Sequence, residues 1–181
     1  MVKMMNTILK QDNQAASFDA RTLRNALGNF ATGVTVITAS NGGRRVGVTV
    51  NSFNSVSLDP PLILWSIGKQ SGSFPVFEEA GYFGVNILAA DQIELSNRFA
   101  RPSIEDKYEG VEVNHGAGGC LLLPDACASL ECQTHSLVDG GDHWIFLGRV
   151  ISLQESGRAP LLFHRGGYSV VSPHPSLEVH G

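Results

Sequence analysis

The sequence lacks long apolar runs and an excess of basic residues, the features that point to a membrane or to nucleic acid. An apolar run such as 62–65 spans only a few residues, whereas a helix that crosses a bilayer needs about 20. Lysine and arginine number 13 against 17 acidic residues, so the net charge is −4. A surface for phosphate backbones would show the opposite balance. We therefore expect neither a membrane nor a nucleic acid as a partner.

Cysteine is scarce, and no spacing of metal ligands is present. The three cysteines, Cys120, Cys127 and Cys132, are odd in number and match no zinc or disulfide signature. The histidines show no HExxH pattern, so we expect no metal site. Residues 1–16 contain no apolar core of the kind a signal peptide has. Reduced cysteines and this N-terminus together favour the cytoplasm.

Internal repeats and linkers are also absent, so the 181 residues fit one domain with two short tails. The sequence is 43% hydrophobic, which is typical of a globular protein, and a chain of this length can bury roughly 70% of its unfolded surface. We expect a flexible N-terminal arm over 1–16, a single domain over 17–172 and a C-terminal tail over 173–181.

What the sequence does contain is a series of short β-type segments separated by turns. The first two, 33–39 and 45–51, flank a Ser-Asn-Gly-Gly stretch that is typical of a hairpin turn. The remaining strand candidates are 62–67, 82–88, 126–138, 143–153, 161–164 and 168–171. Closing such a sheet into a barrel removes its exposed edges. We therefore predict a mainly β fold in which six or seven of these candidate strands form an antiparallel barrel.

Short amphipathic segments predict helices at the periphery of this barrel. The first, over 18–28, has apolar residues at helical spacing and is expected to bury one face. Further helices are expected over 74–80 and 91–100, with a short helical turn over 103–110. The loop 68–73 precedes a helix and is rich in hydrogen-bond donors, so it offers an anion site. Lys69 in this loop could also be a solvated surface residue. Arg44 and Arg45 could reach a phosphate or an adenylate, or could form a solvated hairpin tip.

A chain of small polar side chains follows the second strand candidate. It comprises Thr49, Asn51, Ser52, Asn54, Ser55 and Ser57. Short polar groups at the end of a buried strand suit a flat ligand with polar edges and one anionic end, such as a flavin. The alternative is that these side chains only satisfy the backbone where the strand ends.

Five motifs in this order resemble the short-chain flavin reductase family from about residue 18 to residue 171. They are ATGVTVIT at 31–38, GVTVNSFNSVSLDPPLILWSI at 47–67, FGVNILAADQIELSNRFA at 83–100, GDH at 141–143 and GGY at 166–168. The resemblance implies an FMN-binding split-barrel fold and a homodimer. It also implies transfer of a hydride from NADH or NADPH to FMN or FAD. The reduced flavin would commonly serve a separate flavin-dependent monooxygenase.

The resemblance also implies which residues bind these cofactors. The expected flavin contacts are Thr32, Gly33, Val34, Thr35, Thr49, Asn51, Ser52, Ser55, Val56 and Ser57, with Asn86 and Phe99 bordering the site. Lys69 and Ser71 are expected at the flavin phosphate. His143 is the expected catalytic residue, with a stacking or hydrogen-bonding role at the nicotinamide, and Tyr168 is expected on the same side.

Two other functions remain open for the same fold. One is a non-catalytic flavin or haem carrier, because a fold does not determine its function. The other is an enzyme like pyridoxamine-phosphate oxidase, which would be expected to offer more basic side chains to a second phosphate than this sequence provides. The choices between FMN and FAD, and between NADH and NADPH, are also left open.

Overall fold

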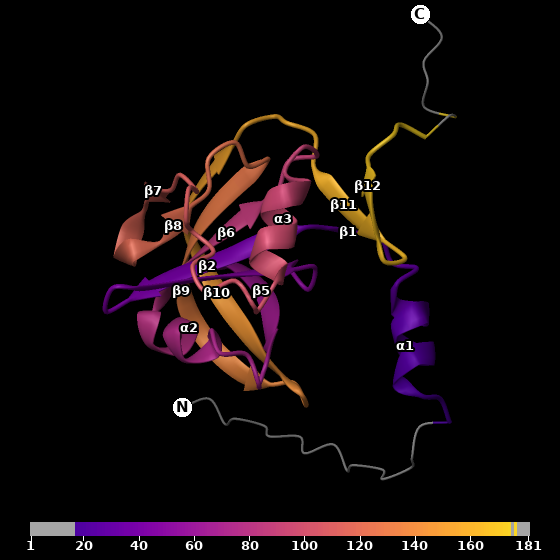
Figure 1. The fold of residues 1–181 in the computed structure, drawn as a ribbon, viewed down its shortest axis with the longest axis horizontal. Coiled ribbons are helices and arrows are strands. Elements are labelled where there is room, and N and C mark those ends of the chain that lie inside the picture. The colour runs from indigo at the N-terminus through magenta and orange to yellow at the C-terminus, as the bar shows by residue number, and fades with distance from the viewer. Residues whose placement is uncertain (1–16, 175, 177–181) are drawn as a thin grey trace, which may run out of the picture.

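One seven-stranded antiparallel sheet dominates the computed structural model, which describes residues 17–174 and 176 (Figure 1). In spatial order its strands are β3 (Arg44–Val50), β2 (Thr35–Asn41), β6 (Tyr82–Ile87), β9 (Ala128–Asp139), β10 (His143–Glu155), β5 (Pro61–Gly68) and β4 (Asn54–Leu58). The prediction of a mainly β, antiparallel fold with short helices is confirmed. The predicted arm over 1–16 lies outside the described residues, as does most of the predicted tail.

The β2–β3 hairpin forms where the sequence predicts it. Gly42 and Gly43 occupy the turn with φ values of 56° and 81°. Two consecutive positive φ angles are required by the turn type that matches the twist of antiparallel strands, and glycine reaches them without steric cost. The register is set by the pairing of Asn41 with Arg44.

The sheet curls until β3 approaches β5, but no ladder closes β3 onto β4 within the described chain. A side chain makes the connection instead. The Ser52 hydroxyl accepts a hydrogen bond from the Ser66 N–H at 3.0 Å and donates to the Ser66 carbonyl at 3.3 Å. The barrel is therefore split at this seam, and the polar segment that follows β3 lies along the opening.

The last predicted hairpin forms but leaves the main sheet. Its strands, β11 (Leu161–His164) and β12 (Gly167–Val170), join β1 (Thr32–Gly33) in a separate three-stranded sheet. The seventh strand of the main sheet is β4, which lies in a segment whose sequence predicts only a series of polar side chains. The remaining short elements are β7 (Asn114–His115), η1 (Ala117–Gly119) and β8 (Leu121–Leu122).

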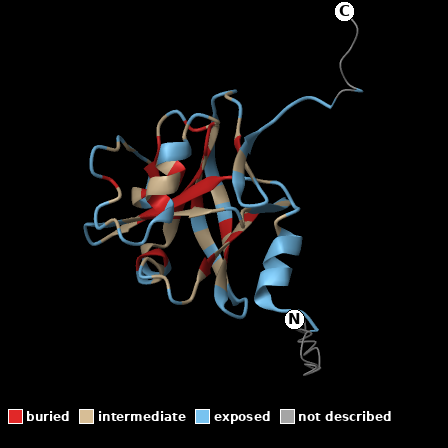
Figure 2. Ribbon diagram, turned by 45° about the vertical axis from the view of Figure 1, so that its right-hand side comes forward, coloured by how far each residue is buried: buried red, intermediate tan, exposed pale blue. Residues whose placement is uncertain are grey.

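Two helices pack against the sheet and one does not. Helices α2 (Phe74–Ala80) and α3 (Ile93–Ala100) each bury residues against it. Helix α1 (Ala20–Leu27) stands beside the barrel and is exposed along its whole length (Figure 2). The prediction that α1 buries one face is therefore wrong for the described chain. The N-cap of α1 is Asp19, whose carboxylate accepts from the Thr22 N–H at 2.7 Å. The predicted helical turn over 103–110 is also wrong, since this segment forms turns.

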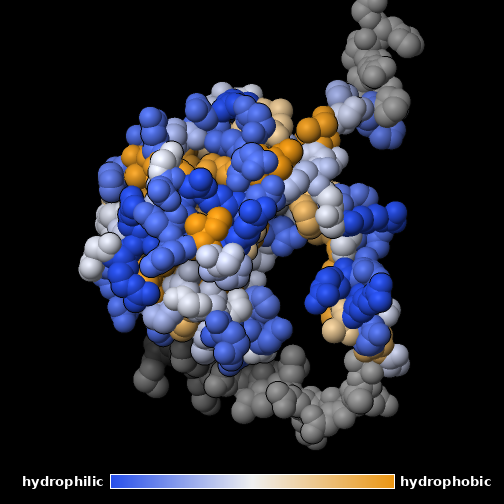
Figure 3. Space-filling view, in the orientation of Figure 1, coloured by the Kyte–Doolittle hydropathy of each residue, from blue (hydrophilic) through white to orange (hydrophobic). Residues whose placement is uncertain are grey.

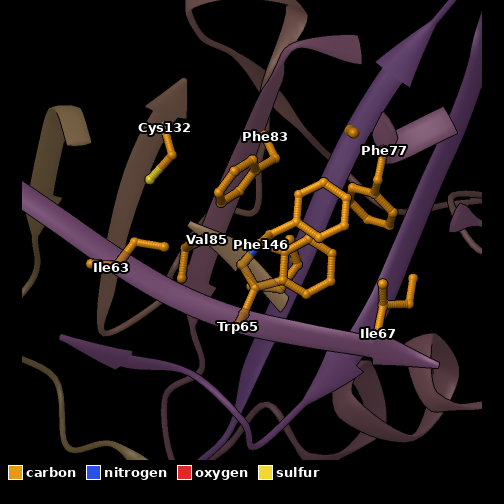
Figure 4. Close-up of a cluster of buried hydrophobic side chains, with 10 residues drawn as sticks. Ile63, Trp65, Ile67, Phe77, Phe83, Val85, Cys132 and Phe146 are labelled. Carbon is orange, nitrogen blue, oxygen red and sulfur yellow. The ribbon is translucent and has the colours of Figure 1, made fainter. Parts of the chain in front are cut away.

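The main core is aromatic and lies inside the barrel (Figure 4). The Trp65 ring stacks on Phe146, with 4.7 Å between the ring centroids, and meets Phe77 and Phe83 edge to face. A second cluster lies under α3 and includes Phe99. The three cysteines are free thiols, as expected. No helix among the described residues is long and apolar enough to span a bilayer.

Candidate functional site

A cleft of about 690 Å³ runs along the open seam of the barrel. One wall is the outer part of β3 with Asn51 and Ser52, and the other is the end of β5 with the loop that precedes α2. The end of α3, the loop after it and His143 complete the lining. This volume is in the range of small-molecule sites, which is typically about 300–1,000 Å³.

A second, larger cleft of about 1110 Å³ lies between α1 and the barrel. Its lining includes Leu27 at the end of α1, Phe30 three residues after it, and Phe163 of β11. Asn51 and Ser52 line both clefts, so the two hollows meet at the end of β3. The space-filling view shows α1 as an arm separated from the barrel by this hollow (Figure 3).

The floor of the first cleft depends on close contact between β3 and α3. The Thr49 hydroxyl donates to the Ser96 carbonyl at 2.7 Å. The ring of Phe99 lies against Gly47, where an added Cβ would come within 2.4 Å of two ring carbons. Phe99 also meets Tyr108 edge to face, with centroids 5.1 Å apart. Only glycine at position 47 lets this aromatic pair reach the strand.

Lys107 brings a positive charge into the first cleft, and the sequence analysis did not single it out. Its ammonium donates to the carbonyl oxygens of Gly47, at 3.1 Å, and Phe99, at 2.7 Å. Both acceptors are neutral, and burial lowers the pKa of this lysine. An ammonium has three donors, so one remains for an anionic ligand. No signal in the sequence marked this residue, because it follows two acidic residues in a segment that was interpreted as the start of a helix.

The neighbouring charged and aromatic residues close the same end of the cleft. The Tyr108 hydroxyl donates to the Val46 carbonyl at 2.7 Å, and burial raises its pKa, so it stays protonated. The Arg45 guanidinium lies 4.9 Å from the centre of the Tyr108 ring and pairs with Asp106 at 3.3 Å. Arg45 lines the cleft as well. It is therefore part of the site rather than only a solvated hairpin tip.

His143 is the first residue of β10 and pairs across the sheet with Gly68 of β5. Its ring lines the first cleft, and its Nδ1 lies 2.6 Å from a carboxylate oxygen of Asp142. This hydrogen bond lowers the pKa of Asp142. The histidine singled out from the sequence thus stands at the cleft wall with one ring nitrogen already bonded.

Lys69 is directed toward the β9–β10 turn rather than into the cleft lining. Its ammonium donates to Asp139 at 2.8 Å and lies 4.7 Å from the centre of the Trp144 ring. The hydrogen bond from Lys69 holds the pKa of Asp139 below its usual value. Ser71, two residues later, does line the cleft. In this structure the ammonium that lines the first cleft is that of Lys107.

The structure brings together about half of the residues that the sequence assigned to the site. Thr49, Asn51, Ser52, Ser71, Phe99 and His143 line the first cleft, and Thr32 lines the second. The Thr32 hydroxyl oxygen is buried and has no hydrogen-bond partner within residues 17–174. The side-chain amide of Asn51 also makes no hydrogen bond to the described chain, but Asn51 is exposed, so water can satisfy this amide. The buried Thr32 hydroxyl is the group that indicates a polar ligand.

The other predicted residues line neither cleft. They are Gly33, Val34, Thr35, Ser55, Val56, Ser57, Lys69, Asn86 and Tyr168. Asn86 is fully buried and joins strands, since its amide donates to the Val36 carbonyl and accepts from the Leu123 N–H. Tyr168 hydrogen-bonds Ser96 and Asn97 of α3, both at 2.9 Å. Asn86 and Tyr168 therefore connect elements next to the clefts without lining either cleft themselves.

The arrangement suits binding and orientation of a cofactor more than acid–base chemistry. In the described part of the chain, no cluster of metal-ligating side chains is present. The first cleft offers hydroxyl and amide groups along β3, a lysine at one end and a histidine at the opposite wall. Residues of this kind fit a flavin, whose ring has polar edges and whose side chain ends in phosphate. The free Asn51 amide, the unpartnered Thr32 hydroxyl and the third donor of Lys107 are consistent with that fit.

Comparisons with known proteins agree with this assignment. Residues 27–172 match the family model described as a flavin reductase like domain. A protein of Rhizobium meliloti (strain 1021) named probable flavin reductase is 46% identical over 155 residues, which cover 85% of this chain and 50% of that protein. The reductase subunit HsaB of a flavin-dependent monooxygenase from Rhodococcus jostii (strain RHA1) is 41% identical over 90% of this chain and 84% of its own length.

A solved structure shows the same fold. The NADH:FAD oxidoreductase SgcE6 of Streptomyces globisporus C-1027, in complex with NAD and FAD fragments, superposes with a TM-score of 0.81 at 37% identity. The match covers 89% of this chain and 99% of that one. The chain spans half the length of the Rhizobium protein but most of the length of the other two. With the cleft geometry and these matches together, the chain belongs to the flavin reductase family.

Proposed function

We propose that the protein catalyses reduction of FMN or FAD by NADH or NADPH and supplies the reduced flavin to a separate monooxygenase. The observation that carries this proposal is the cleft at the split seam, where the polar end of β3 faces His143. The names of the Rhodococcus and Streptomyces relatives support flavin, NADH and a monooxygenase partner. Family membership also favours a reductase over an enzyme like pyridoxamine-phosphate oxidase.

The chain's own residues bind and orient the two cofactors. Asn51 and Ser52, at the junction of the two clefts, contact the edge of the flavin ring system, and Thr49 and Phe99 form the floor beneath the ligand. Lys107 meets an anionic group of the ligand, because charge-assisted hydrogen bonds to phosphate are stronger than neutral ones. When bound, the flavin supplies the acceptor for the hydride of the nicotinamide. His143 orients the nicotinamide from the opposite wall, and no proton transfer by the protein is required.

The assay that tests this function follows NADH and NADPH at 340 nm with FMN or FAD added, in all four combinations. A reductase consumes the nicotinamide in proportion to enzyme, with flavin required. Titration of the same protein with flavin, followed by flavin fluorescence, measures binding separately. A carrier would bind flavin or haem and leave the nicotinamide unchanged, and that outcome would refute the proposed activity.

Replacing Asn51 by alanine should weaken flavin binding about 5- to 30-fold. The amide is exposed at the junction of both clefts and is free to meet the ligand, and a buried hydrogen bond to a ligand is worth about 1–2 kcal/mol. Ser52 is a poorer choice for this test, because its hydroxyl already ties the seam. Ser55→Ala is the matched control, since Ser55 lies on β4 outside both clefts. Equal flavin dissociation constants for Asn51→Ala and Ser55→Ala would contradict the placement.

Replacing His143 by alanine should raise the KM for NADH about three- to tenfold and leave the flavin dissociation constant within about twofold. The imidazole lines the wall opposite Asn51, so its loss affects the second cofactor rather than the first. Steady-state kinetics with flavin saturating give the KM, and flavin titration gives the affinity. His164→Ala is the control, because this exposed histidine at the end of β11 lines neither cleft itself. Unchanged NADH kinetics in His143→Ala would remove the proposed role.

The protein should form a homodimer through the exposed face of α1. Leu27 and Phe30 are 64% and 73% exposed, and both line the second cleft. Burial of such side chains against a second copy would recover the hydrophobic contribution that the single chain leaves unused. Sedimentation should give a dimer for the wild type, and Leu27→Glu combined with Phe30→Glu should shift it toward monomer. A fully active wild-type monomer at micromolar concentration would contradict this interface.

A further inference from the structure

The contact between Asp142 and His143 determines which ring nitrogen of the histidine carries its proton. Nδ1 lies 2.6 Å from Asp142 Oδ1, and the pKa of that carboxyl group is lowered by the contact. Near neutral pH the carboxylate is ionised and can only accept a hydrogen bond. Nδ1 must therefore be the donor. In a neutral imidazole the other nitrogen, Nε2, is then a bare acceptor.

The backbone of the turn holds this pair in place. The Lys69 N–H donates to the Asp142 carbonyl at 3.0 Å, and the Gly140 N–H donates to the His143 carbonyl at 3.0 Å. The charged neighbours are Asp139 and Lys69, which pair with each other at 2.8 Å. Lys69 is thus occupied by Asp139, and Asp142 is left to bond the imidazole.

The free nitrogen of the ring lies on the cleft side. Nε2 is the nearest atom to the position that a Cβ on Gly68 would take, at 3.9 Å. Gly68 and His143 both line the first cleft. Within residues 17–174, Nε2 has no hydrogen-bond partner, whereas Nδ1 has one. The acceptor of the ring is therefore available to a ligand in the cleft.

We propose that Asp142 is a positioning residue that keeps His143 in the Nδ1–H tautomer, so that Nε2 accepts a hydrogen bond from the amide N–H of the nicotinamide carboxamide. This rests on the proposed function, because it names the group on the hydride donor that His143 recognises. The carboxamide is the part of the nicotinamide ring system that carries N–H donors. A dinucleotide whose ring bears a methyl ketone instead has no donor to offer and is discriminated against.

The Asp142–His143 contact contributes little to the free energy of folding, so Asp142 can be substituted without unfolding the protein. The Asp142 side chain is 92% exposed and that of His143 is 49% exposed. Exposed pairs of this kind have little effect on stability. Variants at position 142 should therefore fold like the wild type, and any functional change can be attributed to the imidazole.

Three substitutions test which property of Asp142 matters. Asp142→Glu keeps a carboxylate that can only accept, so it should retain the Nδ1–H tautomer. Asp142→Asn offers an amide that can accept from Nδ1–H or donate to a bare Nδ1, so it no longer fixes the tautomer. Asp142→Ala removes the acceptor and leaves the imidazole free to exchange tautomers.

The first measurement is the ¹⁵N NMR spectrum of the His143 imidazole near pH 8, assigned with His143→Ala. The wild type and Asp142→Glu should show a proton on Nδ1 and a bare Nε2, and Asp142→Asn and Asp142→Ala should show a mixture of tautomers. A wild-type ring protonated on Nε2 would overturn the proposal. This spectrum needs neither cofactor nor turnover.

The second measurement is titration of the flavin-saturated protein with NAD⁺ and with its 3-acetylpyridine analogue, in which a methyl ketone replaces the carboxamide. The ratio of the two dissociation constants should favour NAD⁺ about three- to tenfold more in the wild type than in His143→Ala. Asp142→Glu should keep most of this preference, and Asp142→Asn and Asp142→Ala should lose most of it. If Asp142→Ala keeps the wild-type preference, the tautomer does not determine the contact and the proposal is wrong.

The outcomes also separate this inference from the proposed function. A wild type that oxidises NADH with added flavin but shows no preference linked to His143 retains the reductase function and refutes the role of Asp142. A wild type that does not oxidise NADH refutes the reductase function, and the imidazole spectrum then still decides whether Asp142 fixes the tautomer.

Discussion

Replacing Trp65 by alanine is expected to lower the free energy of unfolding by about 3–5 kcal/mol. Trp65 is fully buried in β5, and its ring touches three other aromatic rings of the core (Figure 4). Removing the indole deletes its buried apolar surface and leaves a cavity that the stiff neighbouring strands cannot fill. Because typical domains are stable by only about 5–15 kcal/mol, the loss is a large fraction of the total. Urea unfolding at one protein concentration, followed by far-UV circular dichroism, measures it.

Trp65→Phe is the matched control for this prediction. The Trp65 Nε1–H is buried and has no acceptor within the described chain, so the indole carries an unsatisfied donor. Phenylalanine keeps most of the stacking on Phe146 and removes that donor, so its cost should be below about 1.5 kcal/mol. A Phe variant as unstable as the Ala variant would show that the aromatic contacts are not what holds the core.

The Trp65–Phe146 stack also connects the core to the candidate site. These two residues face each other across the β5–β10 ladder, and three residues further along the same ladder Gly68 faces His143. Ser66 and Ile67, next to Trp65 on β5, line the first cleft. The core therefore holds the two strand ends that place the histidine wall opposite β3.

The sequence pattern predicted the elements whose formation depends on residues that are neighbours in the chain. The β2–β3 hairpin follows from two glycines at positive φ, and β9 and β10 follow from long β-type segments with a glycine turn between them. Strand β4 was not predicted because its edge position leaves its side chains largely exposed, so no apolar alternation marks it. The destination of the β11–β12 hairpin was not predictable either, because sequence pattern shows that a hairpin forms but not which sheet it joins.

Of the residues proposed for the site, those that directly follow a strand end lie at the first cleft, whereas others are held elsewhere by tertiary contacts. Asn51 and His143 reach the cleft directly from β3 and β10. The Tyr168 hydroxyl instead hydrogen-bonds Ser96 and Asn97, and the Lys69 ammonium hydrogen-bonds Asp139. These partners lie some 70 residues away in the chain. The ammonium of Lys107 is held at the cleft because it donates hydrogen bonds to carbonyl oxygens of β3 and α3. Such pairings depend on the finished fold, so no spacing in the sequence reveals them.

Helix α1 is a further element whose surroundings the sequence pattern did not predict. Its apolar spacing predicts a buried face, yet that prediction is wrong for the described chain, in which every residue of α1 is exposed. In the homodimer proposed above, a second copy of the chain would cover this face. On this interpretation the periodicity reports an assembly rather than the single-chain core, and sequence alone does not distinguish the two.

Replacing Gly47 by alanine is expected to destabilise the protein by about 1–3 kcal/mol and to weaken flavin binding by at least about tenfold. The added methyl group would lie 2.4 Å from two carbons of the Phe99 ring and 3.1 Å from the Tyr108 hydroxyl. Phe99 is 1% exposed and cannot swing away, because Tyr108 packs on its ring. The backbones also cannot separate freely, since Lys107 bridges the carbonyls of Gly47 and Phe99. Relief must come from moving α3 or the ring, and Phe99 lines the first cleft.

The sign of this effect distinguishes crowding from the ordinary effect of glycine. Glycine in a strand normally costs about 0.5–1 kcal/mol relative to alanine, so Gly33→Ala in β1, where no atom lies within 4 Å of the added Cβ, should be neutral or stabilising. Phe99→Leu should destabilise the wild type by leaving a void, yet it should stabilise Gly47→Ala by making room for the methyl group. Such a reversal is a coupling between neighbours that only direct contact produces. Additive effects of the two substitutions on unfolding and on flavin affinity would show that Gly47 does not serve the approach of Phe99 to the cleft.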